Sequence, residues 1–463
     1  MSSAPLRVAV IGSGPAGFYA AGALLASDDP PVEVDLFERL PTPWGLVRLG
    51  VAPDHPKIKS VSRAFEKIAQ RPGFRFFGNV EVGRDLSHDE LSELYDAVIY
   101  AFGAQTDRRM GIPGEDLPGS WPATAFVAWY NGHPDFQGIP FDLSSERAVV
   151  IGNGNVAVDV ARMLALTAEE LAPTDTTDEA IAAIVGSGIR EILVLGRRGP
   201  AQAAFTPPEL QELTELAGTD LVVDPGDLEL DAASAAALED DSAIARRNVE
   251  LLREAAGRPP AGKPRTLRLR FCASPVAILG EGRVEAVEVV RNELVADASG
   301  RIRAVPTDGR EVIPCGIVLR SVGYRGTAMS GVPFDDERAT IRNDDGRVLD
   351  DAGAQLPGVY CTGWIKRGPS GVIGTNKKDA TETVELLLAD VRSGALAGAG
   401  ERNAGAVDEI LAGRGVAVVS YAGWQAIDAA ECERGAEQGR PRVKLCRWEE
   451  LLRAAQGSRP SKV

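Results

Sequence analysis

The chain has 463 residues, more than one hydrophobic core usually supports, so we expect two domains. Hydrophobic residues make up 44% and charged residues 25% of the sequence, as in ordinary globular proteins. The net charge of −16 argues against nucleic acids and anionic membranes as partners. It does not exclude an acidic protein, because protein docking depends on a local patch of charge.

We expect a cytoplasmic protein without a membrane span or a signal peptide. No apolar run reaches about 18 residues, the length that a membrane helix needs. The first expected strand begins at Leu6, with no basic and apolar leader before it. The 5 cysteines are far apart and form no C-x-x-C pair, which is typical of buried thiols in a reducing compartment.

A strand, a glycine-rich turn, a helix and a second strand follow one another over residues 6–38. In the turn, Gly12 allows a tight bend, Gly14 lets the backbone approach a pyrophosphate, and Gly17 lets the helix and the strand pack closely. The N-terminus of the helix offers N–H groups to that pyrophosphate. Glu38 ends the second strand, where an acid accepts hydrogen bonds from a ribose diol. The unit therefore predicts a dinucleotide site.

The same pattern returns in the middle of the chain. A strand over 148–151 leads into Gly-Asn-Gly-Asn-Val-Ala at 152–157, and the next strand, over 191–196, ends on Arg197 and Arg198. Arginines at this position suit a ribose 2′-phosphate by charge and by bidentate geometry, whereas Glu38 suits a free 2′-hydroxyl. The second unit therefore predicts NADP rather than NAD.

Two dinucleotide folds in one chain are typical of oxidoreductases that use FAD and a pyridine nucleotide. We predict an α/β protein with two Rossmann-like domains of the glutathione-reductase type, the NADP domain being inserted in the FAD domain. The expected boundaries are 1–106 and 326–463 for the FAD-binding domain and 107–325 for the NADP-binding domain. A strand that ends at Gly363 and a helix that begins after Gly371 are expected to complete the flavin site.

A basic cluster lies at the end of an alanine-rich helix expected over 231–256. It includes Arg246, Arg247 and Arg253, in a chain that is otherwise acidic. The cluster is either a solvated helix face or a docking patch for an acidic partner.

The sequence resembles the adrenodoxin reductase family, and it is most similar to the bacterial NADPH–ferredoxin reductases of that family. The resemblance covers nearly the whole chain. It rests on the motifs at 12–17, 41–48, 52–57, 152–157, 196–199 and 363–369.

The resemblance implies non-covalent FAD, NADPH as electron donor, an acidic iron–sulfur ferredoxin as acceptor, and no metal site. With the two glycine-rich turns, it places FAD at Gly12, Gly14, Ala16, Gly17, Glu38, Leu46, Val82, Gly363, Trp364, Gly371, Val372 and Ile373. It places NADP at Asn153, Gly154, Asn155, Val156, Arg197, Arg198, Glu209 and Gly371. It associates His55 and Glu212 with the nicotinamide–flavin region, and Arg246 and Arg247 with ferredoxin docking. We expect a monomer.

The predicted activity is electron transport from NADPH to FAD and then, one electron at a time, to ferredoxin, which feeds a cytochrome P450 or another redox pathway. Flavin disulfide reductases such as thioredoxin reductase need a redox cysteine pair, and the electron-input module of glutamate-synthase-like enzymes needs an early cysteine cluster. Neither feature is present in the sequence. An NADPH sensor would need a damaged flavin site, whereas Glu38, Gly363 and Gly371 are all present here. An FAD-dependent NADPH oxidase or monooxygenase with a small-molecule acceptor stays open as the alternative.

Overall fold

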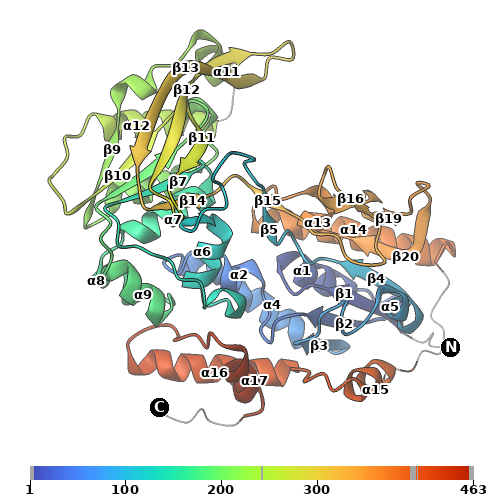
Figure 1. Cartoon of the computed structure of the whole chain (residues 1–463). Helices are drawn as coiled ribbons and strands as arrows, with labels where there is room; N and C mark the ends of the chain where they lie inside the picture. Colours follow the sequence, from blue (N-terminus) through green and yellow to red (C-terminus); the bar gives the residue numbers. More distant parts are fainter. Residues whose placement is uncertain (1–4, 241–242, 397–402, 404, 458–463) are drawn as a thin grey trace. The chain divides into compact units, whose positions relative to one another are not determined.

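The chain divides into two compact units, which we describe separately. The computed structural model describes residues 5–240, 243–396, 403 and 405–457. Unit 1 comprises Met1–Thr106 and Gly323–Val463, and unit 2 comprises Asp107–Val322 (Figure 1). The sequence analysis placed the second boundary at 325/326, whereas the contacts place it at 322/323. None of the helices described is long and apolar enough to cross a membrane.

Unit 1 is built on a seven-stranded sheet with the order β18-β19-β20-β4-β1-β2-β3. Its first four strands in the chain are parallel, and β20, which comes after unit 2 in the sequence, pairs in parallel with β4. This return of the chain confirms the predicted insertion of one Rossmann-like fold in the other. The strands are β1 (Leu6–Ile11), β2 (Val32–Glu38), β3 (Phe74–Gly78), β4 (Ala97–Tyr100), β18 (Asn343–Asp344), β19 (Arg347–Leu349) and β20 (Gln355–Cys361).

Alternate residues of β1 divide the core of unit 1 into two layers, as the two-residue period of a strand requires. Val8 and Val10 join the layer beneath α1 and α14, and Ala9 and Ile11 join the layer on the other face. The helices of this unit are α1 (Pro15–Leu24), α2 (Leu46–Leu49), α3 (Pro56–Lys59), α4 (Ser62–Ala69), α5 (His88–Leu94), α13 (Trp364–Arg367), α14 (Ile373–Ser393), α15 (Ala406–Gly413), α16 (Tyr421–Glu437) and α17 (Trp448–Ala455).

The C-terminal segment of the chain covers the edge of this sheet. Gly78 of the edge strand β3 and Val419 exchange two backbone hydrogen bonds, each of 2.8 Å. Pairing of this kind protects an edge strand from other chains. Helices α3 and α4 lie between the first glycine-rich unit and β3 in the sequence.

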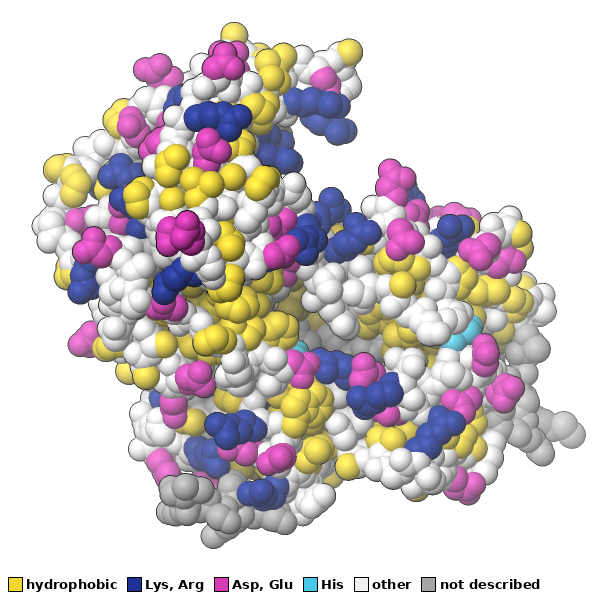
Figure 2. Space-filling view, in the orientation of Figure 1, with side chains coloured by type: hydrophobic (Ala, Val, Ile, Leu, Met, Phe, Trp, Pro, Cys, Tyr) yellow, Lys and Arg dark blue, Asp and Glu magenta, His cyan; other side chains and the backbone are white. Residues whose placement is uncertain are grey.

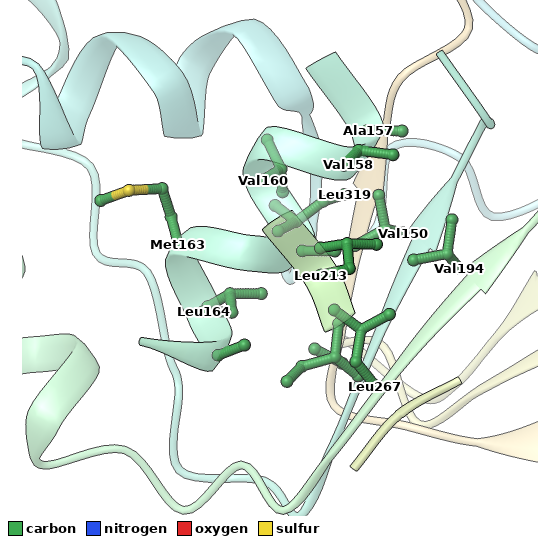
Figure 3. Packing of buried hydrophobic residues seen from close by; sticks show 14 of the residues in the cluster. Val150, Ala157, Val158, Val160, Met163, Leu164, Val194, Leu213, Leu267 and Leu319 are labelled. Carbon is green, nitrogen blue, oxygen red and sulfur yellow. The ribbon is translucent and has the colours of Figure 1, made fainter. Parts of the chain in front are cut away.

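Unit 2 has a parallel six-stranded sheet with the order β6-β14-β7-β8-β10-β9. Figure 3 shows its core, in which Val158 and Leu164 of α7 pack with Val150 of β7 and Val194 of β8. The strands are β6 (Ser120–Pro122), β7 (Arg147–Ile151), β8 (Glu191–Leu195), β9 (Thr219–Val223), β10 (Arg265–Arg270) and β14 (Ile317–Arg320). The helices are α6 (Ala123–Tyr130), α7 (Asn155–Ala165), α8 (Ala168–Leu171), α9 (Asp178–Val185), α10 (Pro207–Glu215), α11 (Ala232–Asp240) and α12 (Ala243–Ala256).

A second sheet of unit 2 was not expected from the sequence. It is antiparallel and has the order β11-β12-β13, formed by Ala273–Leu279, Ala286–Ala296 and Ile302–Pro314. The long helix expected over 231–256 is replaced by α11 and α12, and residues 241–242 between them lie outside the described residues. The remaining short strands are β5 (Thr106–Asp107), β15 (Tyr324–Arg325), β16 (Phe334–Asp335) and β17 (Thr340–Ile341).

Candidate functional sites

The turn between β1 and α1 has the three features that a phosphate-binding turn needs. Gly12 has a φ of +105°, and a Cβ there would lie 2.6 Å from the Phe102 Cα. A Cβ on Gly17 would lie 1.9 Å from the Gly12 carbonyl oxygen. By contrast, a Cβ on Gly14, the N-cap of α1, would meet no atom within 4 Å. The turn is therefore tight on two sides and open at the N-terminus of the helix, where an anion is stabilised.

Glu38 is held firmly at the end of β2. Its Oε2 accepts hydrogen bonds from the backbone N–H of Ser13 (3.1 Å) and from the Ser13 hydroxyl (2.6 Å). Its Oε1 accepts one from the backbone N–H of Leu40 at 3.0 Å. Because a carboxylate offers about four acceptor positions, Glu38 keeps capacity for a ribose hydroxyl.

The structure brings Gly363 and Ala16 together, although they lie in the two separate segments of unit 1. A Cβ on Gly363 would lie 2.6 Å from the Ala16 Cβ. The Gly363 N–H donates to Asp379 Oδ2 at 2.5 Å, which ties the turn after β20 to α14. The returning segment thus reaches the first glycine-rich turn.

The N-terminus of α14 carries the last predicted FAD residues. Gly371 has a φ of +80°, Val372 is the N-cap, and Ile373 begins the helix. Trp364 is tied to this segment because its indole N–H donates to the Ser370 carbonyl at 3.2 Å. Val372 is 66% exposed, an unusual position for an apolar side chain. Gly371 was predicted for both cofactors and belongs to unit 1.

The proline-rich loop over residues 39–45, which follows Glu38, contacts the first glycine-rich turn. The Trp44 N–H donates to the Ser13 carbonyl at 2.9 Å, and a Cβ on Gly45 would lie 3.0 Å from the Gly14 Cα. Leu46, the predicted FAD residue of this loop, is 40% exposed. Trp44 is buried with a φ of +82°, a conformation that non-glycine residues rarely adopt.

Two further predicted residues lie elsewhere in unit 1. Val82 is buried in the core layer that contains Ile11, whereas Ala16 belongs to the other layer. His55 is the half-buried N-cap residue of α3, and its N–H donates to the Ala52 carbonyl at 3.0 Å.

A buried ion pair anchors the proline-rich loop and the short helix α2 to helix α16. The Arg48 guanidinium binds Glu431 through both of its terminal nitrogens, at 2.9 and 2.5 Å, and the Leu445 N–H adds a bond of 2.9 Å. The guanidinium also lies 5.1 Å from the Trp424 ring, which packs edge-on against Trp44. The sequence analysis missed this anchor, since no local motif joins residues 383 positions apart.

The second glycine-rich turn, in unit 2, repeats the first. A Cβ on Gly152 would lie 2.1 Å from the Ser321 carbonyl oxygen, and one on Gly154 would meet nothing within 4 Å. The third glycine is replaced by Ala157, which is fully buried in the core. The Asn153 amide nitrogen is buried without a hydrogen-bond partner among the described residues. The turn therefore has open space at Gly154 for a ligand and one buried N–H donor, on Asn153, without a partner among the described residues.

Asn155 joins this turn to the segment that leads into α10. Its Oδ1 accepts from the Thr206 N–H at 2.9 Å, and the Asn153 carbonyl accepts from the N–H groups of Ala204 (3.0 Å) and Phe205 (3.1 Å). Val156 is half-buried in the first turn of α7. These bonds place the predicted acids of α10 beside the second turn.

Arg197 and Arg198 follow β8 at the carboxyl edge of the parallel sheet. Arg197 is exposed and Arg198 is half-buried. Burial, together with the charge of Arg197, lowers the pKa of Arg198. No carboxylate of the described residues forms an ion pair with either guanidinium. The pair is therefore a compact positive site that an anion can neutralise.

The acids Glu209 and Glu212 on α10 face a buried arginine of α7. The Arg162 side chain is 3% exposed, and its Nε lies 3.4 Å from Glu212 Oε2 while its Nη2 lies 2.6 Å from Asp159. Burial lowers the pKa of Arg162, and the negative charges of Glu212 and Glu209 oppose that shift. Glu209 Oε2 is buried without a hydrogen-bond partner among the described residues. A charged residue on the apolar face of α7 was the sequence signal for Arg162, which the sequence analysis did not use.

Comparison with known proteins places the chain in a family. Residues 6–194 match the family described as pyridine nucleotide-disulphide oxidoreductase. The NADPH-ferredoxin reductase FprA of Mycobacterium tuberculosis is 51% identical over 462 residues, which cover 98% of this chain and 100% of FprA. The chain belongs to the adrenodoxin reductase family. The human mitochondrial NADPH:adrenodoxin oxidoreductase is 42% identical over 461 residues, covering 96% of this chain and 91% of that protein.

The solved structures agree with this membership of the adrenodoxin reductase family. The structure of Mycobacterium tuberculosis FprA in complex with NADPH has a TM-score of 0.93 at 51% identity, covering 98% of this chain and 100% of that chain. An atomic-resolution structure of the same oxidoreductase, described with a covalent modification of NADP⁺, also has a TM-score of 0.93.

In this chain, the basic cluster lies on the surface, and neighbouring acids compensate part of its charge. Arg247 Nη1 lies 3.1 Å from Glu250 and 3.4 Å from Glu254, and its side chain is 46% exposed. Arg246 donates to the Leu238 carbonyl at 3.2 Å, and Arg253 is exposed. Figure 2 shows one face of the molecule, on which Lys and Arg side chains are interspersed with Asp and Glu.

Proposed function

We propose that this chain is an NADPH–ferredoxin reductase. It takes a hydride from NADPH onto FAD and delivers single electrons to an iron–sulfur ferredoxin. Membership of the adrenodoxin reductase family supports the proposal. The observation that carries it is the contrast between the two turns, since the strand after the first ends on Glu38 and the strand after the second ends on the arginine pair.

Unit 1 has the features that FAD requires. The open cradle at Gly14 and the N-terminus of α1 suit the pyrophosphate, and Glu38 suits the ribose diol. The exposed side chains of Leu46 and Val372 give apolar surface that a bound flavin would cover. The remaining FAD residues that we propose are Gly12, Ala16, Gly17, Val82, Gly363, Trp364, Gly371 and Ile373.

Unit 2 has the features that NADPH requires. The unpartnered groups are a buried donor on Asn153, a buried acceptor on Glu209 and the positive charges of Arg197 and Arg198. Buried polar atoms are nearly always hydrogen-bonded in the functional state, so these atoms point to a ligand that completes them. The cradle at Gly154 suits the pyrophosphate. The remaining NADP residues that we propose are Asn155, Val156 and Gly371.

When bound, FAD supplies the chemistry that couples a two-electron donor to a one-electron acceptor. The chain contributes binding and orientation, and its glycine-rich turns would hold both pyrophosphates at helix N-termini. We propose that His55 and Glu212 orient the nicotinamide amide or relay a proton. Arg162 holds the Glu212 side chain in place, because its buried guanidinium lies 3.4 Å from that carboxylate.

We propose that exposed arginines of α12, namely Arg246 and Arg247, dock an acidic ferredoxin. Electrostatic complementarity of this kind accelerates association and loses strength at high salt. Both cofactor sites are made of residues of one chain, so we propose a monomer. The five free cysteines are in keeping with a reducing compartment such as the cytoplasm.

Anaerobic stopped-flow reduction tests the function. Purified holoenzyme is mixed with NADPH or NADH, and ferredoxin with cytochrome c is then added. We expect rapid bleaching of the flavin band with NADPH, a much weaker response to NADH, and cytochrome c reduction that depends on ferredoxin. Flavin reduction without the ferredoxin-dependent step would instead favour an oxidase or a monooxygenase with a small-molecule acceptor.

A further inference from the structure

The backbone of the arginine pair is held by the second sheet of unit 2. The Arg197 carbonyl accepts a hydrogen bond of 2.8 Å from the side-chain amide of Asn292, which lies on β12. The Arg198 carbonyl accepts one of 3.1 Å from the backbone N–H of Cys272, which comes just before β11. Two successive carbonyls of the turn after β8 are thus fixed by residues far away in the sequence.

Asn292 is placed so that its amide can act in one orientation only. It is 4% exposed and lies where the register of β12 shifts. Its Nδ2 also donates to the Ser274 hydroxyl at 2.8 Å, and its backbone N–H donates to the Cys272 carbonyl at 2.7 Å. Its Oδ1 is buried without a partner among the described residues. A flipped amide would put this oxygen against the Arg197 carbonyl, so both amide protons stay committed as donors.

Cys272 adds a second fixed point. Its φ of +53° lies in the left-handed region, which non-glycine residues adopt rarely and only where the surroundings impose it. This conformation directs its N–H to Arg198 and its carbonyl to Asn292. Hydrogen bonds within the chain therefore fix the backbone of Arg197 and Arg198 through Asn292 and Cys272.

We propose that Asn292 is a positioning residue that determines the preference for NADPH over NADH. Recognition of a phosphate by guanidinium groups needs them held within about 0.5 Å of the productive geometry. Two adjacent arginines also repel each other, so a mobile turn would let them separate. Asn292 prevents this by fixing the backbone, and it need not touch the nucleotide. The inference rests on the proposed function, because it assumes that the pair binds the 2′-phosphate of NADPH.

The test uses the holoenzyme with Asn292→Leu, which replaces the amide with an apolar group of similar branching. We expect KM for NADPH to rise about threefold to tenfold, the effect of losing one hydrogen bond in the turn. We expect kcat and KM for NADH to change by less than about twofold. The dissociation constant of 2′,5′-ADP is expected to rise by the same factor as KM for NADPH, and that of 5′-AMP to stay unchanged.

Thr219→Val is the matched control. Thr219 is 1% exposed, and its hydroxyl also donates to a backbone carbonyl, that of Ala165, at 2.9 Å. Thr219 begins β9 and so lies at the amino end of the parallel strands, whereas Arg197 follows the carboxyl end of β8. We expect this variant to lose stability without a change in the NADPH to NADH ratio.

An equal loss of NADPH and NADH affinity in Asn292→Leu, or no loss of either, would overturn the inference while leaving the proposed function intact. A wild-type enzyme that reduces its flavin equally well with both nucleotides would overturn the inference and the NADPH assignment together. If Asn292→Leu does not fold, Asn292→Asp takes its place. Asn292→Asp keeps the shape of the side chain but removes both donors, and we expect at least the same loss of 2′,5′-ADP binding.

Discussion

Removal of the buried carboxylate of Glu431 is expected to destabilise unit 1 strongly. Glu431 is fully buried, and Glu431→Ala removes the partner of two hydrogen bonds from Arg48, one from Arg442 and one from the Leu445 N–H. The Arg48 side chain is 3% exposed, so its charge would remain in the interior without a counter-ion. Breaking a buried pair in this way costs about 3–5 kcal/mol. In domains of roughly 150–250 residues this corresponds to a fall in Tm of about 6–20 °C.

Calorimetry of the protein without added FAD measures this effect. Bound cofactor would mask it, because a ligand at a hundred times its Kd adds about 2.7 kcal/mol of stability. Arg283→Ala is the control, since Arg283 pairs with Asp142 at 2.8 Å but the two side chains are 52% and 44% exposed. We expect this exposed pair to contribute less than about 1 kcal/mol. A fall in Tm for Glu431→Ala no larger than that of the control would refute the assignment of Arg48–Glu431 as the anchor of the loop.

The pH dependence of the same group has a definite sign. Burial raises the pKa of Glu431, but the charges of Arg48 and Arg442 and the hydrogen bonds from Arg48 and the Leu445 N–H together outweigh burial, so the pKa lies below its ordinary value of 4.5. A carboxyl group with a lowered pKa in the folded state adds stability above its unfolded pKa and loses it as the pH falls through the folded value. Wild-type unit 1 is therefore expected to lose stability below about pH 4.5 more steeply than Glu431→Ala. Parallel curves would contradict this.

Three further outcomes are expected. Gly17→Ala should yield little soluble holoenzyme, because a Cβ at Gly17 would lie 1.9 Å from a backbone atom. Gly14→Ala should retain the holoenzyme, because a Cβ there meets nothing within 4 Å. Flavin content measures both, and equal content in the two variants would contradict this. Arg198→Ala should raise KM for NADPH about tenfold to a hundredfold and leave KM for NADH nearly unchanged, since one charge-assisted contact of about 1.5–3 kcal/mol is lost; a parallel rise for both nucleotides would refute the role of the pair. Burial raises the pKa of Asp107 from 3.8 to about 6, so the folded state loses stability as the pH rises through that range. Asp107→Asn should therefore stabilise unit 2 at pH 7 in thermal unfolding and lose that advantage below about pH 4, and a pH-independent difference would contradict it.

The elements that local chemistry specifies could be predicted from the sequence. Both glycine-rich turns were predicted because the position of each glycine has a separate steric reason, and the structure shows those close approaches at Gly12, Gly17 and Gly152. The return of β20 to the first sheet followed from the unfinished domain that the second turn interrupts. The roles of Glu38, of the arginine pair and of the other proposed site residues remain predictions.

The contacts that support the turns could not be predicted, because they join positions that share no sequence pattern. Glu431 lies 383 positions from Arg48, and Asn292 lies 95 positions from Arg197. The antiparallel sheet β11–β13 was missed for a related reason. β13 is mostly exposed, and β12 carries Glu288, Arg291 and Glu293 among its apolar residues, so the alternation that marks a half-buried strand is weak there.

In both units, residues outside the nucleotide motifs hold the backbone of those motifs in place. In each, a backbone carbonyl near the expected nucleotide is held by a residue that the nucleotide motif does not contain: the Trp44 N–H binds the Ser13 carbonyl, and the Asn292 amide binds the Arg197 carbonyl. Backbone N–H groups and guanidinium groups bind phosphate well only if they are fixed before the ligand arrives, since ordering them during binding costs affinity. On the proposed assignment, Glu38 and the arginine pair distinguish the two nucleotides, and remote residues hold the backbone that presents them. Substitutions at Glu431 and Asn292 should accordingly reduce cofactor affinity without altering a single motif residue.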